Sequence, residues 1–259
     1  MNSLENKVVL ITGASSGIGE ACARIFAQGG AKLILNARRQ DSLEKLAKEL
    51  NEKYGSECQL LPFDVRDRSS VELNVRSLPA SWSNIEVLIN NAGLSRGLDP
   101  LQDGKIEDWE EMIDTNIKGL LYMTRHITPK MIEQGSGHVI NIGSIAGHDT
   151  YPKGNVYCAT KAAVRTLSEG LKQDLLGTPV RVSCIDPGLV QTEFSLVRFR
   201  GEQEKAEKTY QGLTPLSPKD VADVIYFCAT RPPHVNISEM LVIPTDQSGS
   251  TMVHRNSES

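Results

Sequence analysis

The stretch that decides the fold is Thr12-Gly13-Ala14-Ser15-Ser16-Gly17-Ile18-Gly19. It follows an apolar run and opens a helical pattern, so it is expected to turn a strand into a helix. Gly13 permits a tight turn, Gly17 lets a phosphate approach the backbone, and Gly19 lets the helix pack on the strand. The exposed N–H groups and the dipole of such a helix favour an anion. It is not a Walker A loop, because Glu20 stands where lysine is required. The loop is therefore predicted to bind a nucleotide, with contacts that include Ser15, Ser16 and Ile18.

Outside this loop the chain alternates strand patterns with helix patterns. We expect strands at 8–12, 32–37, 59–63, 87–90, 138–142, 180–185 and 240–243, and helices at 17–28, 42–54, 69–78, 107–133, 156–176 and 219–229. Several strands are apolar throughout, which is typical of a parallel sheet covered on both faces. The pattern predicts one α/β domain over residues 1–259, a doubly wound parallel sheet with right-handed crossovers.

Two segments interrupt the alternation. The stretch 187–218 is long and irregular between a strand and a helix, which is typical of lids and binding loops. We expect a substrate lid at 188–215. The tail 245–259 is polar, and it is expected either to be disordered or to form an arm that docks on a partner subunit.

Composition excludes several classes of protein. The chain of 259 residues is 39% apolar and 23% charged, so it can bury a large core without disulfides or a metal. Its net charge of −4 gives no general affinity for nucleic acid or anionic lipid. No apolar run approaches the roughly 20 residues of a membrane helix, and the polar start does not resemble a signal peptide. Five scattered cysteines without a CxxC pair favour a reducing cytoplasm and predict neither disulfides nor a zinc site.

The end of the second expected strand indicates which nucleotide binds. An acidic residue there would bind the ribose 2′-hydroxyl of NAD, but the sequence reads Asn36-Ala37-Arg38-Arg39. Two guanidinium groups suit a 2′-phosphate, so NADP(H) is favoured over NAD. The segment Asn90-Asn91-Ala92-Gly93 closes the fourth strand, where strand ends face the ligand crevice. Asn91 and Gly93 are therefore expected beside the cofactor, with Asn91 also holding the central strands.

A third pattern predicts the chemistry. Tyr157 and Lys161 are four residues apart, which stacks their side chains on one helix face. A lysine ammonium beside a phenol lowers the pKa of the tyrosine, which can then exchange a proton with an alcohol oxygen. Ser144, thirteen residues earlier, could donate a hydrogen bond to the same oxygen. The pattern predicts a proton-transfer site for a carbonyl or an alcohol.

These motifs, in this order, resemble the short-chain dehydrogenase/reductase family over nearly the whole chain. The resemblance rests on the glycine-rich loop, Asp64-Val65, the Asn-Asn-Ala-Gly turn, Asn116, Ser144, Tyr157 with Lys161, and Pro187-Gly188. It implies a Rossmann-type domain with a seven-stranded sheet, in a homo-oligomer that is usually a tetramer or a dimer; we expect a tetramer.

The resemblance also implies roles for the matching residues. Tyr157 would be the acid/base, and Ser144 would orient the carbonyl. Lys161 would bind the nicotinamide ribose, and Asn116 would sustain a water relay that contacts it. Asp64, with Val65 beside it, would face the adenine. The nicotinamide side would be lined by Pro187, Gly188, Val190 and Thr192.

Several stretches are similar to one branch, the NADP-dependent 3-hydroxy acid dehydrogenases. They include Met112-Ile113-Asp114-Thr115-Asn116, Gly154-Asn155-Val156-Tyr157 and Val197-Arg198-Phe199-Arg200-Gly201. That branch oxidises small β-hydroxy acids or reduces the corresponding semialdehydes, and sulfoacetaldehyde reductases are close relatives.

A small acid substrate needs a cation near the reacting carbon. Arg198 or Arg200 could grip a carboxylate, and in an extended backbone the two would share a face. Asn155 and His148 are further candidates for the pocket. Two other functions stay open: a broad carbonyl reductase for uncharged substrates, and a nucleotide-binding module without catalysis. The intact Asn116, Ser144, Tyr157 and Lys161 argue against the second.

Overall fold

The computed structural model describes residues 3–256 and confirms the predicted α/β fold. Seven parallel strands form one sheet in the order β3-β2-β1-β4-β5-β6-β7. The strands are β1 Val8–Thr12, β2 Lys32–Asn36, β3 Cys58–Leu61, β4 Ile85–Asn90, β5 Gly137–Ile142, β6 Val180–Pro187 and β7 Glu239–Val242. The strand order reverses between β1 and β4. Ligands of open parallel sheets bind beyond the carboxyl ends of the strands at this point.

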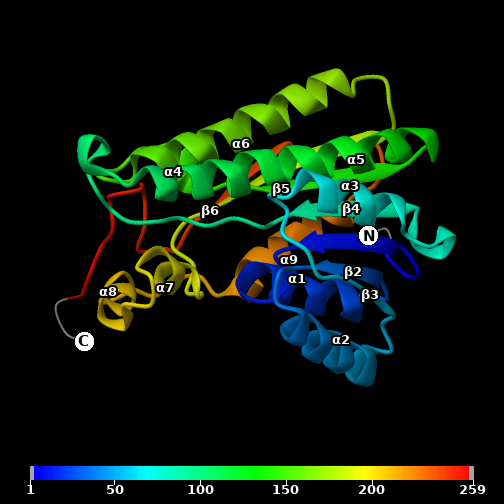
Figure 1. Ribbon diagram of the computed structural model, residues 1–259, viewed down its shortest axis with the longest axis horizontal. Coiled ribbons are helices and arrows are strands. Elements are labelled where there is room, and N and C mark those ends of the chain that lie inside the picture. The colour runs from blue at the N-terminus through cyan, green and yellow to red at the C-terminus, as the bar shows by residue number, and fades with distance from the viewer. Residues whose placement is uncertain (1–2, 257–259) are drawn as a thin grey trace.

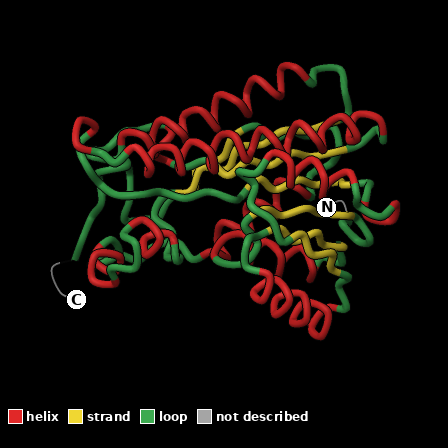
Figure 2. Tube along the Cα trace, viewed as in Figure 1, coloured by secondary structure: helices red, strands yellow, loops and turns green. Residues whose placement is uncertain are grey.

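Helices cover both faces of the sheet, as Figures 1 and 2 show. One face carries α1 (Gly17–Gln28), α2 (Gln40–Tyr54) and α9 (Pro218–Ala229). The other carries α3 (Arg68–Arg76), α4 (Ile106–Ile113), α5 (Leu120–Glu133) and α6 (Asn155–Asp174). Short 3-10 turns lie at η1 (Ala80–Trp82), η2 (Leu101–Asp103) and η4 (Ile145–Gly147). Among the described residues, no helix is long and apolar enough to cross a membrane.

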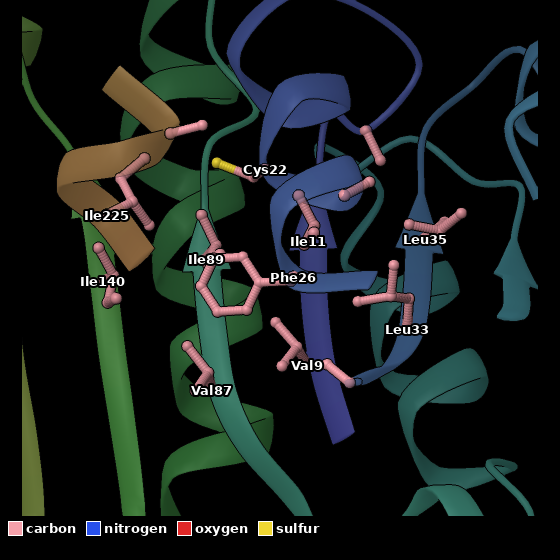
Figure 3. Packing of buried hydrophobic residues seen from close by; sticks show 14 of the residues in the cluster. Val9, Ile11, Cys22, Phe26, Leu33, Leu35, Val87, Ile89, Ile140 and Ile225 are labelled. Atoms are coloured by element: carbon pink, nitrogen blue, oxygen red, sulfur yellow. The ribbon is translucent and has the colours of Figure 1, made fainter. Parts of the chain in front are cut away.

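The all-apolar sequence of β1 follows from this double cover. Val9 and Ile11 lie beside Phe26 of α1, in the cluster that also contains Ile225 of α9 (Figure 3). Val8 and Leu10 belong to the core on the opposite face of the sheet. Every residue of β1 is buried. Because neither face meets water, the strand lacks the apolar–polar alternation of a half-exposed strand.

The structure modifies the expectation of one helix over residues 107–133. Helices α4 and α5 are joined by a π-helical turn, η3 (Asp114–Gly119). Asn116 lies in this turn and is buried. Single π-turns inside helices frequently occur at functional sites, and periodicity alone does not reveal them.

The segment 188–215 is more regular than the sequence indicated. It contains two short helices, α7 (Phe194–Arg198) and α8 (Gln203–Lys208), which lie beside the end of the sheet in Figure 1. The described part of the tail, 245–256, lies against its own chain. Arg255 donates hydrogen bonds to the carbonyl oxygens of Thr209 and Gln211, and the Asn256 N–H donates to Gly212. Residues 257–259 of the predicted tail lie outside the described residues.

Candidate active site

A cavity of about 750 Å³ lies at the carboxyl ends of β1, β2, β4, β5 and β6. One wall is made by the glycine-rich loop, the strand ends, and the side chains of Tyr157 and Lys161 from α6, and we call it the strand-end wall. The opposite wall is made by residues 189–198 and 209–210, and we call it the lid wall. Of the predicted cofactor residues, the cavity is lined by Gly13, Ser15, Ser16, Gly17, Ile18, Arg38, Arg39, Asp64, Val65, Asn91, Gly93, Tyr157, Lys161, Pro187, Gly188, Val190 and Thr192.

The glycine-rich loop has the geometry that its sequence predicts. Gly13 and Gly17 have φ values of 65° and 57°, in the region that favours glycine. A Cβ atom on Gly19 would lie 2.3 Å from the carbonyl oxygen of Gly13, so only glycine fits there. Ser16 caps α1 without a side-chain hydrogen bond. The first N–H groups of the helix are therefore available to a phosphate.

Asn91 ties the two central strands together. Its side-chain amide donates to the carbonyl oxygens of Thr12 and Gly13 at 2.9 and 3.2 Å. The Thr12 hydroxyl accepts hydrogen bonds from the backbone N–H groups of Asn91 and Ala92, each at 3.0 Å. These hydrogen bonds join the carboxyl ends of β1 and β4 at the topological switch point. Asn91 therefore holds the central strands together, as predicted.

Basic side chains surround the far end of the cavity. The Arg39 guanidinium donates to the hydroxyl and the carbonyl oxygen of Ser15, and it lies 3.3 Å from the Glu193 carboxylate. Arg38 lies 3.9 Å from Asp64. Partial burial raises the pKa of Asp64, but hydrogen bonds from Arg66 outweigh it and hold that pKa below its ordinary value. This end of the cavity therefore fits a 2′-phosphate beside an adenosine. Two of its residues, Arg66 and Glu193, were not predicted from the sequence.

Three of the four predicted catalytic residues, Ser144, Tyr157 and Lys161, line the other end of the cavity. Tyr157 and Lys161 lie on one face of α6, both buried, with the Lys161 ammonium 5.9 Å from the centre of the Tyr157 ring. Lys161 Nζ donates to the carbonyl oxygen of Ile142 at 2.8 Å. The Ser144 hydroxyl caps η4 by accepting from the Ala146 N–H at 3.1 Å.

Asn116 is connected to the same region through its side-chain amide. It donates to the carbonyl oxygen of Leu94 and to the hydroxyl of Thr160, and its oxygen accepts from the Leu94 N–H. A Cβ atom on Gly93 would lie 3.3 Å from the Asn116 oxygen and 3.5 Å from Lys161 Nζ. Gly93 therefore keeps open the space between the two polar groups.

Electrostatics differ from the expectation that Lys161 lowers the pKa of Tyr157. Burial raises the pKa of Tyr157 above its ordinary value, and the charge of Arg198 and a hydrogen bond with Ser144 oppose this rise. Burial also lowers the pKa of Lys161 to about 8. The ammonium points to Ile142 rather than to the phenol oxygen, so desolvation dominates both residues in the protein alone.

Only one of the two candidate arginines lines the cavity. The Arg198 guanidinium lies 5.2 Å from the rings of Tyr157 and Phe194, and it donates to the Tyr151 hydroxyl at 2.7 Å. Its Nε atom is buried without a hydrogen-bond partner among the described residues. Arg200 instead pairs with the buried carboxylate of Asp108, outside the cavity lining.

The two arginines therefore do not share a face as an extended backbone would require. Arg198 is the last residue of α7. Two residues later Arg200 has a φ of 53°, and this turn directs the chain away from the cavity. Asn155 donates to the carbonyl oxygen of Asp99, and His148 lies 3.1 Å from Asp186. Neither is among the described residues that line the cavity.

Further residues of the cavity carried no sequence signal. One group of them consists of Leu94, Tyr151, Phe194, Tyr210, Gln247, Ser250, Thr251, Val253 and Arg255. They come from loops, from α7 and from the tail, whose positions depend on tertiary contacts. The Gln247 side chain illustrates this, because it is 4% exposed and accepts a hydrogen bond from the Leu189 N–H.

With this fold and site described, comparison with known proteins identifies the family. The short chain dehydrogenase family model matches residues 7–203, so the chain belongs to that family. The NADP-dependent 3-hydroxy acid dehydrogenase of Shigella flexneri is 51% identical over 96% of this chain and 99% of its own length. Sulfoacetaldehyde reductase 2 of Chromohalobacter salexigens is 45% identical over 94% of this chain and 96% of its own.

A solved structure is also similar. The closed form of serine dehydrogenase complexed with NADP⁺ has 50% sequence identity and a TM-score of 0.90, and it covers 96% of this chain and all of its own. The family, the seven-stranded fold and the ordered motifs therefore agree with the resemblance found in the sequence.

Proposed function

We propose that this protein transfers a hydride between NADP(H) and a small 3-hydroxy acid or the corresponding semialdehyde or keto acid, such as serine or 3-hydroxypropionate. The observation that carries the proposal is Arg198, a cation in the cavity lining 5.2 Å from the ring of Tyr157. The similarity to a 3-hydroxy acid dehydrogenase and to a serine dehydrogenase supports the same substrate class.

NADP(H) fits the strand-end wall. The open N–H groups of α1 suit its diphosphate, and Arg38 and Arg39 suit its 2′-phosphate. Asp64 and Val65 would lie at the adenine, and Lys161 would hold the nicotinamide ribose. The side of the nicotinamide would be lined by Pro187, Gly188, Val190 and Thr192. When bound, NADP⁺ supplies the hydride acceptor for oxidation and NADPH the donor for reduction.

Tyr157 acts as the general base in the oxidative direction. Its phenolate accepts the hydroxyl proton of the substrate, while the Ser144 hydroxyl donates a hydrogen bond to the same oxygen. Because burial raises the pKa of Tyr157, the phenolate depends on positive charge nearby, which Lys161 and Arg198 supply. The Asn116 amide donates a hydrogen bond to the carbonyl oxygen of Leu94. Water held between Asn116 and Lys161 would return the proton to solvent.

Arg198 binds the acid group of the substrate. Its guanidinium is planar and can donate two parallel hydrogen bonds to a carboxylate, and its Nε atom has no competing partner among the described residues. The Tyr151 hydroxyl accepts a hydrogen bond from Nη2 of Arg198, and the guanidinium lies 5.8 Å from the centre of the Tyr151 ring. Arg200, which lies in the lid, and Asn155, which begins α6, are then not contacts of the substrate. The lid, residues 188–215, closes over the substrate.

A rate comparison tests the proposal. The purified chain is supplied with NADP⁺ and with either L-serine or 3-hydroxypropionate, and matched alcohols without the acid group, ethanolamine and 1-propanol, serve as controls. We expect a clear preference for the acids and for NADP⁺ over NAD⁺. Equal turnover of the alcohols that lack the acid group would contradict the role of Arg198 but leave the chemistry of Tyr157 intact.

The second candidate is a broad NADPH-dependent carbonyl reductase, including one for sulfonates. It is supported by the 45% identity to a sulfoacetaldehyde reductase, because a sulfonate offers Arg198 the same anionic oxygens. Reduction of sulfoacetaldehyde, malonic semialdehyde and an uncharged aldehyde, compared at equal concentration, separates these substrate classes. Absence of turnover with every substrate would favour a nucleotide-binding module without catalysis.

We also infer a homo-oligomer, with a tetramer as the expected state. Helices α4 and α5 with the turn between them expose Ile106, Ile113, Leu121 and Ile132, which is apolar surface suited to a second copy. The mass in solution tests this. All five cysteines are free, which suits a reducing cytoplasm.

A further inference from the structure

Three potential ligands for a cation gather behind the turn that carries Ser144. His148 follows η4, Asp186 lies near the end of β6, and Glu239 begins β7. His148 Nε2 is 3.1 Å from Asp186 Oδ2 and 3.4 Å from Glu239 Oε1, and all three ligand atoms lie within 4.8 Å of one another. Among the described residues that line the cofactor cavity, none of the three is present, so this is a separate site.

Asp186 is the independent indication that this cluster binds something. The residue is 0% exposed, and its Oδ1 atom accepts hydrogen bonds from the Ser144 N–H at 3.0 Å and the Cys184 thiol at 3.3 Å. Its Oδ2 atom is buried and has no hydrogen-bond partner among the described residues, although the His148 ring is near. A buried carboxylate oxygen with no donor in hydrogen-bonding geometry is costly, and the nearest polar atom to this one is His148 Nε2, 3.1 Å away.

The spacing suits a small divalent cation. Bonds from zinc to imidazole nitrogen and carboxylate oxygen are roughly 2.0–2.2 Å long, which places neighbouring ligand atoms about 3–3.6 Å apart. The two distances from His148 Nε2 match this range. One imidazole and two carboxylates form a mixed nitrogen and oxygen set that suits Zn²⁺ better than Mg²⁺ or Ca²⁺.

The site is open to solvent on one side. The side chains of His148 and Glu239 are 26% and 36% exposed, so an ion can enter and water can complete its coordination. Arg165 donates to Glu239 Oε1 at 2.5 Å and therefore competes with a cation for that oxygen. This competition lowers the affinity below that of a dedicated structural zinc site.

We propose that His148, Asp186 and Glu239 bind a divalent transition-metal cation, with Zn²⁺ as the best match. The cysteines gave no reason to expect a zinc site, but none of the proposed ligands is a cysteine. Because Asp186 bridges the cation and the backbone N–H of Ser144, an occupied site would brace the turn on which Ser144 lies.

Binding of the metal alone tests the proposal independently of enzyme activity. The full chain, purified with chelator and then freed of it, is titrated with Zn²⁺ against a chromophoric competitor and with Co²⁺ by absorption spectroscopy. We expect one ion per chain and a Co²⁺ spectrum without thiolate charge-transfer bands. Glu239→Gln and His148→Ala should each weaken binding at least tenfold, and His234→Ala, a change at an exposed histidine elsewhere, should leave it unchanged.

A fourth variant measures the competition. Arg165→Met removes the guanidinium from Glu239 and should tighten Zn²⁺ binding several-fold. Three results would overturn the proposal: less than one ion per chain at saturating metal, thiolate bands that place the ion on cysteines, or unchanged affinity in both Glu239→Gln and His148→Ala. In the last case the cluster is an ion-pair network only.

Discussion

The strand-end wall and the lid wall of the cavity are held in place in different ways. Asn91 and Lys161 in the strand-end wall bond to backbone carbonyl oxygens of the sheet and its loops, and both Tyr157 and Lys161 are buried. The lid wall is joined to the rest of the chain by single hydrogen bonds from loop and side-chain groups, such as Arg198 to the Tyr151 hydroxyl and the Leu189 N–H to Gln247. It is also joined by the ion pair between Arg39 and Glu193. The side chains of Arg39 and Glu193 are 53% and 55% exposed.

This difference indicates where chemistry and selectivity reside. Buried backbone contacts hold atoms within the tolerance that proton transfer requires. An exposed ion pair contributes little stability, about 0–1 kcal/mol, so the pair between Arg39 and Glu193 restrains the lid wall only weakly against the strand-end wall. We therefore expect substitutions in the strand-end wall to affect turnover with every substrate, and those in the lid wall to affect the choice of substrate.

The largest effect is expected from Tyr157→Phe. This change removes the phenol oxygen but keeps the ring that packs on Phe194. Turnover should fall by roughly 10²–10⁴-fold or more with acids and uncharged alcohols alike, because general acid–base catalysis is lost. NADP⁺ affinity, measured by fluorescence titration, should survive. Turnover near that of the wild type would show that the strand-end wall does not carry the proton transfer.

The next effect concerns stability and the burial of Lys161. Its pKa falls from 10.5 to about 8 on folding, which corresponds to about 3 kcal/mol. Between pH 8 and pH 10.5 the unfolded chain binds more protons than the folded chain, so the free energy of unfolding rises with pH. Below pH 8 Lys161 is charged in both states, and the full cost of burying that charge remains. Lys161→Met lacks this penalty.

Denaturant titration of the cofactor-free protein checks this prediction. The stability of the Lys161→Met variant relative to wild type should decrease by about 3 kcal/mol from pH 7.5 to pH 10.5. The lost hydrogen bond to Ile142 adds the same offset at every pH, so the slope is diagnostic. A constant difference would mean that Lys161 is not buried as a charge.

Arg198→Met tests whether the lid wall selects substrates that carry an acid group. Hydrogen bonds to a charged group contribute about 1.5–3 kcal/mol, so kcat/KM for L-serine and 3-hydroxypropionate should fall roughly 10–100-fold. The rate with uncharged alcohols should change little. Arg200→Met is the matched control, because that arginine pairs with Asp108 outside the cavity. Equal losses in both variants would indicate a general effect on the lid.

The smallest effect is expected at the boundary between the two walls. Arg39→Ala should weaken NADP⁺ binding about 10-fold, the loss of one exposed charge-assisted contact, and leave NAD⁺ binding unchanged. It also releases Glu193 of the lid wall. Isothermal titration with both nucleotides measures this. Equal weakening for NAD⁺ and NADP⁺ would contradict recognition of the 2′-phosphate.

Much of the strand-end wall could be predicted from the sequence, because its residues follow local rules. The loop from Thr12 to Gly19 requires glycine where φ is positive and where the backbone of Gly13 approaches α1. The spacing of Tyr157 and Lys161 places both on one face of a helix. These rules depend on neighbours in the chain, so the sequence alone determined the succession of elements along it: strand, anion-binding loop, helix and catalytic pair.

Only the tertiary structure decided the rest, because it depends on segments far apart in the chain. It separated Arg198 from Arg200 by the turn at Arg200, and it brought Gln247 and Arg255 of the tail to the cavity. It also showed that burial, which is a property of the packed protein, raises the pKa of Tyr157 more than the charge of Arg198 and the hydrogen bond with Ser144 lower it. Periodicity and motif spacing report local geometry; desolvation and long-range contacts exist only once the chain has folded.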